Sequence, residues 1–387
     1  MLSFLFFFLL SLGQTGRISF SNQEINVNLY DFFIAFWLTW LLFRFKSTPL
    51  KESFKKLKIL YIFIAWLAMT FLLSLFGFST QENTVALLYL LRLTTYLAFF
   101  IYLSFALSKE ENMQKSFLNG ITIFAILTGF FSILQYVLYP NLKNLEYLGW
   151  DPHLYRVFGT FLDTSASAAV FGLILLYFIL QKKIILPKIL RFTLVILFAL
   201  LGLLTYSRGF YVSILITFFT FLVFKKQYVA VLLTVFLFTI SLFLLPKQFG
   251  EGVNLSRQFS IESRLKDEKE AISIGEKHVL FGIGYNHIRY VREKVGDIFD
   301  KQASHAGASF HSSFLIIFAT SGLIGLVLFV STLVKLSSIS EVARQYVVFL
   351  SLFSLFDNIL LYPVVLVLFL SFLAFEISKN RKAIFRT

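Results

Sequence analysis

The chain contains no cysteine and little charge. The absence of cysteine from 387 residues excludes disulfides, thiol catalysis and thiolate metal sites, although it says nothing about the compartment. Charged residues make up only 14% of the chain, whereas 58% is hydrophobic and 51 residues are phenylalanine. This composition suits a polypeptide dissolved in lipid rather than in water. It indicates a polytopic membrane protein without a soluble domain.

Long apolar runs recur from one end of the chain to the other. Crossing about 30 Å of hydrocarbon takes roughly 20 apolar residues in a helix, and the runs are continuous rather than alternating, so helices are expected instead of barrel strands. The runs predict an all-α membrane bundle of about twelve transmembrane helices. The predicted spans are 2–12, 29–43, 59–78, 85–107, 117–138, 165–180, 189–206, 210–224, 229–245, 312–334, 346–360 and 364–375.

The first run, 2–12, is short for a span. A signal peptide is the alternative, but the run has no basic segment before it and no Ala-x-Ala-like site after it, so a retained helix is expected. If it does not cross, the remaining helices keep their orientation and the N-terminus lies outside.

Lysine and arginine gather in every second connector, which accounts for most of the net charge of +14. Cytoplasmic loops carry this excess in membrane proteins. The pattern predicts that both termini are cytoplasmic and that the long polar segment 246–310 faces outward. It divides the chain into an N-terminal bundle (1–245), a large outward loop with short helices (246–311), and C-terminal helices with a basic tail (312–387).

Several cations are not explained by this topology, because they lie on the outward side or inside spans. Arginine is costly near lipid unless it is paired, and its planar fork suits phosphate, so these residues are candidate anion ligands. Asp357 lies near the outer end of the penultimate predicted span. This off-centre polar layer is unlike the midplane sites of transporters. The arginines are Arg92, Arg156, Arg208, Arg257, Arg264, Arg289 and Arg292.

Ordered short motifs carry a family resemblance. They are Arg156-Val-Phe-Gly-Thr-Phe161, Thr205-Tyr-Ser-Arg-Gly209, Glu262-Ser-Arg264, Leu280-Phe-Gly-Ile-Gly-Tyr285, His311-Ser-Ser-Phe-Leu315 and Thr320-Ser-Gly-Leu-Ile-Gly325. Together they resemble the O-antigen ligase and polymerase superfamily of bacterial membrane glycosyltransferases. The chain departs from the family at Val279, commonly Pro, at Ser312, commonly Asn, and at Thr164 and Ser165, where Asn is common. None of these departures removes a charged group.

The resemblance implies a GT-C-like bundle in the bacterial inner membrane with its active site on the periplasmic side. It implies transfer of a glycan from undecaprenyl diphosphate to an acceptor hydroxyl, such as one on lipid A-core. The implied mechanism is inverting and metal-independent, without a cofactor, and nucleic acid is not an expected partner. His311 would be the base, and Arg208 and Arg264 would hold the diphosphate. Second-tier candidates are Arg156, Arg92, Arg289, Arg292, His305 and Asp357.

Simpler interpretations stay open for each residue. Arg208 could be an interfacial anchor, Arg264 part of a solvated ion pair, and Arg289 and Arg292 a solvated charged face. His311 could be a capping or packing group. His287 with His305 could suggest a zinc site, although no acidic residue stands at ligand spacing.

The function itself has three readings. A ligase and a repeat-unit polymerase differ in their acceptor, which one sequence does not reveal. A transporter or flippase of lipid-linked sugars is the alternative from another class. The single dominant outward loop favours the ligase.

Overall fold

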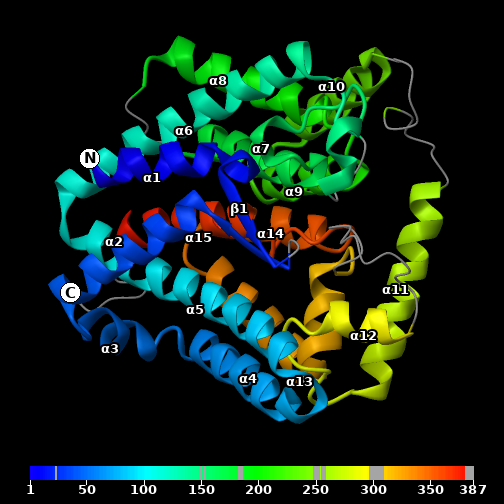
Figure 1. Ribbon diagram of the computed structural model, residues 1–387. Helices are drawn as coiled ribbons and strands as arrows, with labels where there is room; N and C mark the ends of the chain where they lie inside the picture. The colour runs from blue at the N-terminus through cyan, green and yellow to red at the C-terminus, as the bar shows by residue number, and fades with distance from the viewer. Residues whose placement is uncertain are drawn as a thin grey trace.

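The computed structural model describes residues 1–21, 24–148, 150, 153–181, 186–246, 253, 259–295 and 309–379 (Figure 1). Each predicted apolar run is a helix. The helices are α1 (Leu2–Ser11), α2 (Leu29–Phe45), α3 (Thr48–Phe54), α4 (Lys58–Ser74), α5 (Thr80–Lys109), α6 (Glu111–Leu138), α7 (Thr164–Leu180), α8 (Lys188–Leu203), α9 (Arg208–Phe224), α10 (Tyr228–Leu244), α11 (Phe259–Lys277), α12 (Ile288–Val295), α13 (Ser313–Ser337), α14 (Glu341–Phe353) and α15 (Pro363–Lys379).

Four helical segments in the described part of the chain are long and apolar enough to cross a membrane. They are Lys58–Gly77, Thr80–Lys109, Glu111–Leu138 and Ser313–Ser337. Other apolar helices, such as α1, α7, α9 and α10, have between 10 and 17 residues, fewer than the roughly 20 that a perpendicular crossing takes. The protein is a membrane protein, and the count of about twelve crossings stays a prediction.

The centre of the bundle is formed by α7 and α15. Almost every residue of both helices is buried, including polar ones such as Ser167 and Ser371. The start of α7 is rich in small residues, which let neighbouring helices approach closely. At Gly172, a Cβ atom would come within 2.2 Å of the Phe349 ring from α14. The packing of α7 against α14 therefore depends on a residue without a side chain.

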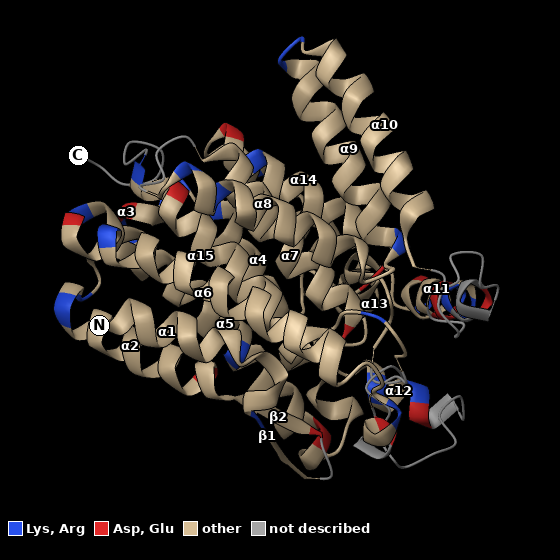
Figure 2. Cartoon of the chain, turned by 90° about the horizontal axis from the view of Figure 1, so that it is seen from above, with Lys and Arg blue, Asp and Glu red and all other residues tan. Residues whose placement is uncertain are grey.

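The elements divide between two ends of the molecule. Figure 1 shows the N-terminus and α3 at one end, and α11 and α12 at the other. We call the second the loop end. The hairpin lies between the two ends in this view, and its residues line one cavity together with α12. In Figure 2, basic and acidic residues mark α11 and α12, whereas the helices between the two ends are almost free of charge. The same view shows α9 and α10 projecting from the body.

The fold is mostly helical, as predicted, and a small two-stranded hairpin adds to it. Strands β1 (Arg17–Phe20) and β2 (Ile25–Asn28) pair antiparallel, with Arg17 opposite Asn28. Asn28 also begins α2, through a capping box with Asp31. The hairpin lies in the connector between the first two predicted spans.

α13 contains a break that its uniform apolar sequence does not reveal. Gly322 has φ +70° and ψ −175°, outside the helical region. The chain around Gly282 fills the break, because the amides of Ile283 and Gly284 donate to the carbonyls of Ala319 and Thr320, at 2.9 and 3.0 Å. A Cβ at Gly282 or Gly322 would come within 2.3 Å of the opposing backbone. Two of the motifs noted in the sequence are thus a single interlocked structure.

Candidate active site

Helix α11 lies at the loop end and carries two charged residues toward the body. Arg264 and Asp267 are three positions apart, so they share one side of the helix with the buried Ala271 and Ile274. These apolar residues belong to a small core that includes Phe310, Ile316 and Ala319. This packing fixes the two charged side chains next to the start of α13.

Asp267 binds His311. Its Oδ2 lies 2.5 Å from His311 Nδ1. Burial alone lowers the pKa of His311, but the hydrogen bond to Asp267 and the negative charge of Asp357 outweigh it, so that the pKa is raised above its ordinary value. Burial alone raises the pKa of Asp267, but the hydrogen bond and charge of His311 and the charge of Arg292 hold it below its ordinary value. Asp267 is thus an anion beside the imidazole.

A buried arginine in turn holds Asp267 in place. Arg292 on α12 binds Asp267 Oδ1 through Nη2 at 3.0 Å and pairs with Glu270 through Nε, also at 3.0 Å. Its Nη1 donates to the carbonyl of Ser309 at 3.1 Å. Both Arg292 and Asp267 are only 7% exposed. Burial rules out the solvated-face interpretation of Arg292 and makes it a positioning group for the dyad of Asp267 and His311.

Arg264 reaches the connection between α14 and α15. Its Nη2 lies 3.0 and 3.2 Å from the two carboxylate oxygens of Asp357, and its Nη1 donates to the Phe356 carbonyl at 2.9 Å. The Ser165 hydroxyl, at the start of α7, donates to the same carboxylate at 2.8 Å. Arg264 therefore makes a long-range ion pair, not the solvated pair on its own helix that was the simpler alternative.

Arg208 is the first residue of α9. Ser207 caps that helix by accepting from the Phe210 amide. A Cβ at Gly209 would meet the Phe353 ring at 2.9 Å, so this turn lies against the end of α14. Arg208 is within electrostatic range of both Arg264 and Asp357, and His311 is in range of the same pair. The structure thus brings Arg208, Arg264, Asp357 and His311 together at the loop end.

A comparison with protein families matches the segment that carries most of these residues. A family model described as O-antigen ligase matches residues 193–330. This match, over 138 of the 387 residues, supports membership of the O-antigen ligase and polymerase superfamily. No curated protein matches the chain. The superfamily implies a membrane glycosyltransferase of the ligase or polymerase type.

The part matched to the superfamily contains most of the site. Arg208, Arg264, Asp267, Arg292 and His311 all lie within residues 193–330. Asp357 and the stretch around Arg156 lie outside it. The structure joins both to the matched part, Asp357 through Arg264 and Arg156 through the turn that precedes Arg208.

Arg156 binds the turn that precedes Arg208. It is 5% exposed, and its Nε donates to the carbonyl of Thr205 at 2.8 Å. Gln135 fixes the same stretch, because its Oε1 accepts from the amides of Phe158 and Gly159. Arg156 therefore braces the turn that presents Arg208.

Other sequence candidates lie elsewhere. Arg92 on α5 binds Asp31 on α2, so it joins two helices and the hairpin, apart from His311. Arg289 lines a cavity at the loop end. His287 is fully buried, with its ring nitrogens bonded to Ser74 and Asn83, which makes it structural. His305 and Arg257 lie outside the described residues.

Sequence reasoning missed Asp267 and Glu270. Both stand in the run Lys266-Asp-Glu-Lys-Glu270, which is typical of a solvated surface. The available signal was helical spacing, because Arg264, Asp267, Ala271 and Ile274 recur at intervals of three and four. An aspartate on the apolar side of an amphipathic helix needs a partner.

Proposed function

We propose that this protein transfers a glycan from undecaprenyl diphosphate to an acceptor hydroxyl, as an O-antigen ligase with lipid A-core as acceptor. The observation that carries the proposal is the meeting of the Asp267–His311 dyad with Arg264, Asp357 and Arg208 at one end of a membrane bundle. A positioned base lies next to a site for a diphosphate. The description of the matching family model supports a ligase.

The arginines take the charge of the leaving group. Arg208 and Arg264 contribute two positive charges against the single negative charge of Asp357, so this trio carries a net charge of +1 when no ligand is bound. Guanidinium groups bind phosphate oxygens bidentately through fixed donors. Asp357 orients Arg264 through Nη2, and within the described residues the Nε of Arg264 makes no hydrogen bond, so this donor is available to a ligand. Neutralisation by arginine suits catalysis without a metal ion or cofactor.

His311 takes the proton of the acceptor. Since Asp267 accepts from Nδ1–H, the other nitrogen, Nε2, carries the lone pair that a base needs. The acceptor oxygen attacks the anomeric carbon as its proton moves to Nε2. The bond from that carbon to the diphosphate oxygen breaks, and its electron pair leaves with the diphosphate held by the arginines. Attack from the side opposite the leaving group inverts the anomeric carbon.

The protein would lie in the bacterial inner membrane. Its loop end would face the periplasm, and the opposite end, with the N-terminus and α3, would face the cytoplasm. The alternation of basic connectors supports this orientation, with both termini cytoplasmic. The polyprenyl tail would lie in lipid against apolar helix surfaces while its diphosphate reaches Arg208. The proposed division of the chain is a bundle of residues 1–245, an outward loop of 246–311 and C-terminal helices of 312–387.

Transfer in proteoliposomes tests the proposal. Purified protein receives a lipid-diphosphate-linked glycan and an acceptor, and His311→Ala should lower transfer by about 10²–10⁴-fold while binding of undecaprenyl diphosphate persists. Unchanged transfer, or a defect only in movement of the lipid-linked sugar across the bilayer, would contradict the enzyme. Lipopolysaccharide profiles of a deletion strain complete the test, because a lost ligase leaves bare core whereas a lost polymerase leaves core capped with one unit.

A further inference from the structure

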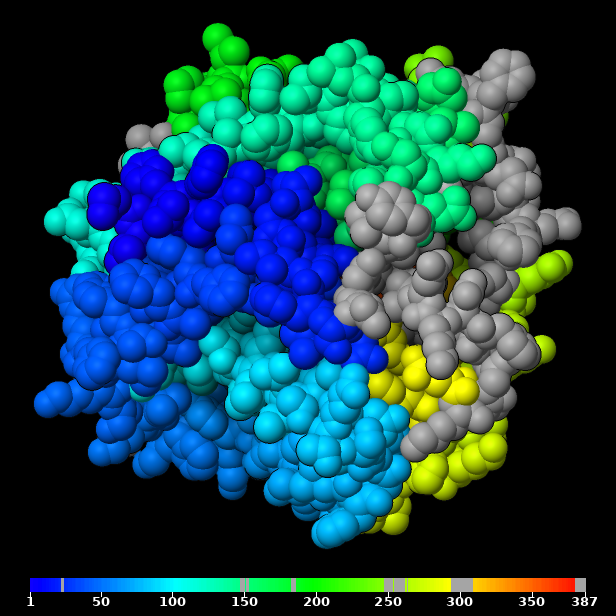
Figure 3. All heavy atoms as spheres, in the orientation of Figure 1, coloured from blue at the N-terminus to red at the C-terminus, as the bar shows by residue number. Residues whose placement is uncertain are grey.

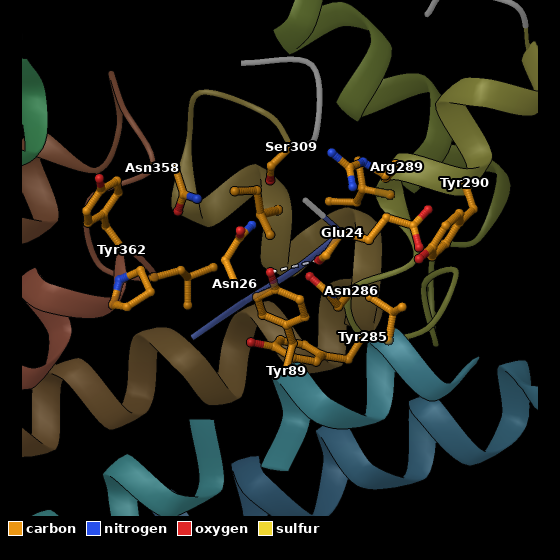
Figure 4. A pocket seen from close by; sticks show the side chains of 15 residues that line it. Glu24, Asn26, Tyr89, Tyr285, Asn286, Arg289, Tyr290, Ser309, Asn358 and Tyr362 are labelled. Carbon is orange, nitrogen blue, oxygen red and sulfur yellow. Dashed lines mark hydrogen bonds between the residues drawn. The ribbon is translucent and has the colours of Figure 1, made fainter. Parts of the chain in front are cut away.

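A cavity of about 230 Å³ opens at the loop end beside the candidate active site (Figure 4). It lies where the hairpin, the start of α5, α12 and the connection between α14 and α15 meet. Figure 3 shows the hairpin segment in blue against α12 in yellow. The side chains that matter below are Tyr89, Tyr285, Asn286, Arg289, Ser309 and Asn358.

The wall of the cavity combines aromatic faces with amides. Tyr89 and Tyr285 lie together on one side in Figure 4, and the amides of Asn26, Asn286 and Asn358 are spread around the space. The Tyr89 hydroxyl donates to the Glu24 carbonyl at 3.1 Å, which holds its ring in place. A wall of rigid rings with several separated donors and acceptors matches a sugar ring, which has apolar faces and a rim of hydroxyls.

Two donors in the cavity are left for a ligand. Within the described part of the chain, the Arg289 guanidinium forms no hydrogen bond or ion pair, although it lines the cavity and is half-buried. Asn358 accepts from Ser313 through Oδ1, at 3.0 Å, which turns its amide nitrogen to other partners. Donors of this kind suit hydroxyl and carbonyl oxygens.

The cavity shares two chain segments with the site. Ser309 precedes His311 by two residues, so their Cα atoms are at most about 7 Å apart. Asn358 follows Asp357, which binds Arg264. The carbonyl of Ser309 is also held by Arg292, the residue that positions Asp267. A ring in the cavity would therefore lie within reach of the base.

The cavity suits neither half of the lipid carrier. It is too small and too polar for an isoprenoid chain, and Glu24 in its wall opposes a diphosphate. The arginines that suit the diphosphate, Arg208 and Arg264, do not line it. Two saccharides remain, the donor glycan and the acceptor glycan. The donor glycan is joined to the diphosphate, and neither arginine proposed to hold that diphosphate lines the cavity, so the acceptor saccharide is favoured.

We infer that this cavity binds one pyranose ring of the acceptor glycan, next to the ring whose hydroxyl attacks or that ring itself. The inference rests on the proposed function and deepens it. Arg289, Asn286 and Asn358 would bond the ring's oxygens, and Tyr89 and Tyr285 would cover its face. Specificity for the acceptor would then lie with the hairpin and α12, apart from the residues that handle the diphosphate.

Saturation-transfer NMR on the full chain in nanodiscs tests the inference, with methyl glycosides of glucose, galactose and N-acetylglucosamine as probes. The variants are Asn286→Gly and Arg289→Met. Asn286 has φ +62°, a conformation that glycine adopts without strain, so this change removes the amide alone. Lys269→Met, on an exposed position of α11, is the matched control for loss of a positive charge.

We expect at least one glycoside to bind the wild type and the Lys269 variant, and about tenfold weaker binding to the other two variants. Binding should persist when undecaprenyl-diphosphate-linked N-acetylglucosamine is present. No binding to the wild type, equal binding to all variants, or displacement by the lipid-linked sugar overturns the acceptor subsite. Binding of undecaprenyl diphosphate is measured on the same samples. If the wild type did not bind undecaprenyl diphosphate, that result would instead contradict the proposed function.

Discussion

Arg92 and Arg264 are both arginines paired with an aspartate from a distant segment, yet they have different surroundings. Arg92 uses all three nitrogens, donating to Tyr96 at 2.8 Å, to the Asn26 carbonyl at 3.1 Å and to Asp31 at 2.7 Å. Its side chain is 14% exposed. Arg264 uses two nitrogens, is 27% exposed, and has a second guanidinium, Arg208, in electrostatic range.

The difference in partners distinguishes an arginine that stabilises the fold from one that is a candidate for binding a ligand. Arg92 is saturated and joins α2, α5 and the hairpin, so it stabilises the fold at the loop end. Arg264 keeps donor capacity, and a second cation, Arg208, lies within electrostatic range of the same carboxylate, as the proposed diphosphate site requires. The sequence presents the two residues alike, as arginines that topology does not require.

The largest effect is expected at His311. His311→Ala should lower transfer by about 10²–10⁴-fold, because the acceptor loses its base, while thermal stability stays close to that of the wild type. Initial rates with a lipid-linked donor, together with a melting curve, measure both. If the His311→Ala variant had a lower melting temperature but normal transfer when folded, His311 would be a structural residue like Arg92.

Arg92→Met should act on stability instead. Removing one partner of a buried pair leaves Asp31 uncompensated and costs about 3–5 kcal/mol. Thermal or denaturant unfolding in detergent measures the cost. Adding Asp31→Asn should recover part of the loss, and the folded fraction should retain transfer. Normal stability with lost transfer would show that Arg92 belongs with the chemistry.

Arg264→Lys keeps the positive charge but removes the planar guanidinium that can bind a phosphate with two donors. Transfer should fall by about 10²–10³-fold, since a positioned donor to the leaving group is removed. Lys225→Met, which breaks an ion pair with Glu341 at the far end of α9, serves as the control and should transfer normally. Equal rates for Arg264→Lys and the wild type would mean that only charge matters at this position.

The smallest effect is a shift along the pH axis. The base must be neutral, so transfer rises with pH through the pKa of His311, and that pKa is raised by Asp267 and Asp357 against the effect of burial. Asp267→Asn removes one of the raising groups, so the rise should move to lower pH. The dependence of kcat/KM on pH measures the shift. If the rise of kcat/KM with pH stayed at the same pH, Asp267 would not set the pKa of the base.

Much of the fold follows from hydrophobic runs, because burial in lipid leaves the helix as the one spanning element that satisfies its own backbone. Each predicted run is a helix, and the split at Pro363 is confirmed by the end of α14 at Phe353 and the start of α15. The hairpin was missed because its strands are four residues each and lie in a polar connector. The break at Gly322 was missed because it depends on hydrogen bonds to a segment some forty residues earlier.

The site was predictable in part. Arg208, Arg264 and His311 stand in ordered motifs, and the structure brings them together. Asp267 and Arg292 could not be ranked above their charged neighbours, since a sequence of mixed charges does not say which member is buried. The bracing role of Arg156 depends on a contact with Thr205, 49 residues away, which no local pattern indicates.

The most direct measurement is the affinity of the wild type, Arg208→Met, Arg264→Met and Arg92→Met for undecaprenyl diphosphate in nanodiscs, at a temperature where all four are folded. We expect each of the first two substitutions to weaken binding by about tenfold or more, and Arg92→Met to bind like the wild type. Equal affinities throughout, or a loss confined to Arg92→Met, would contradict the claim that the guanidinium groups of Arg208 and Arg264 hold the lipid diphosphate.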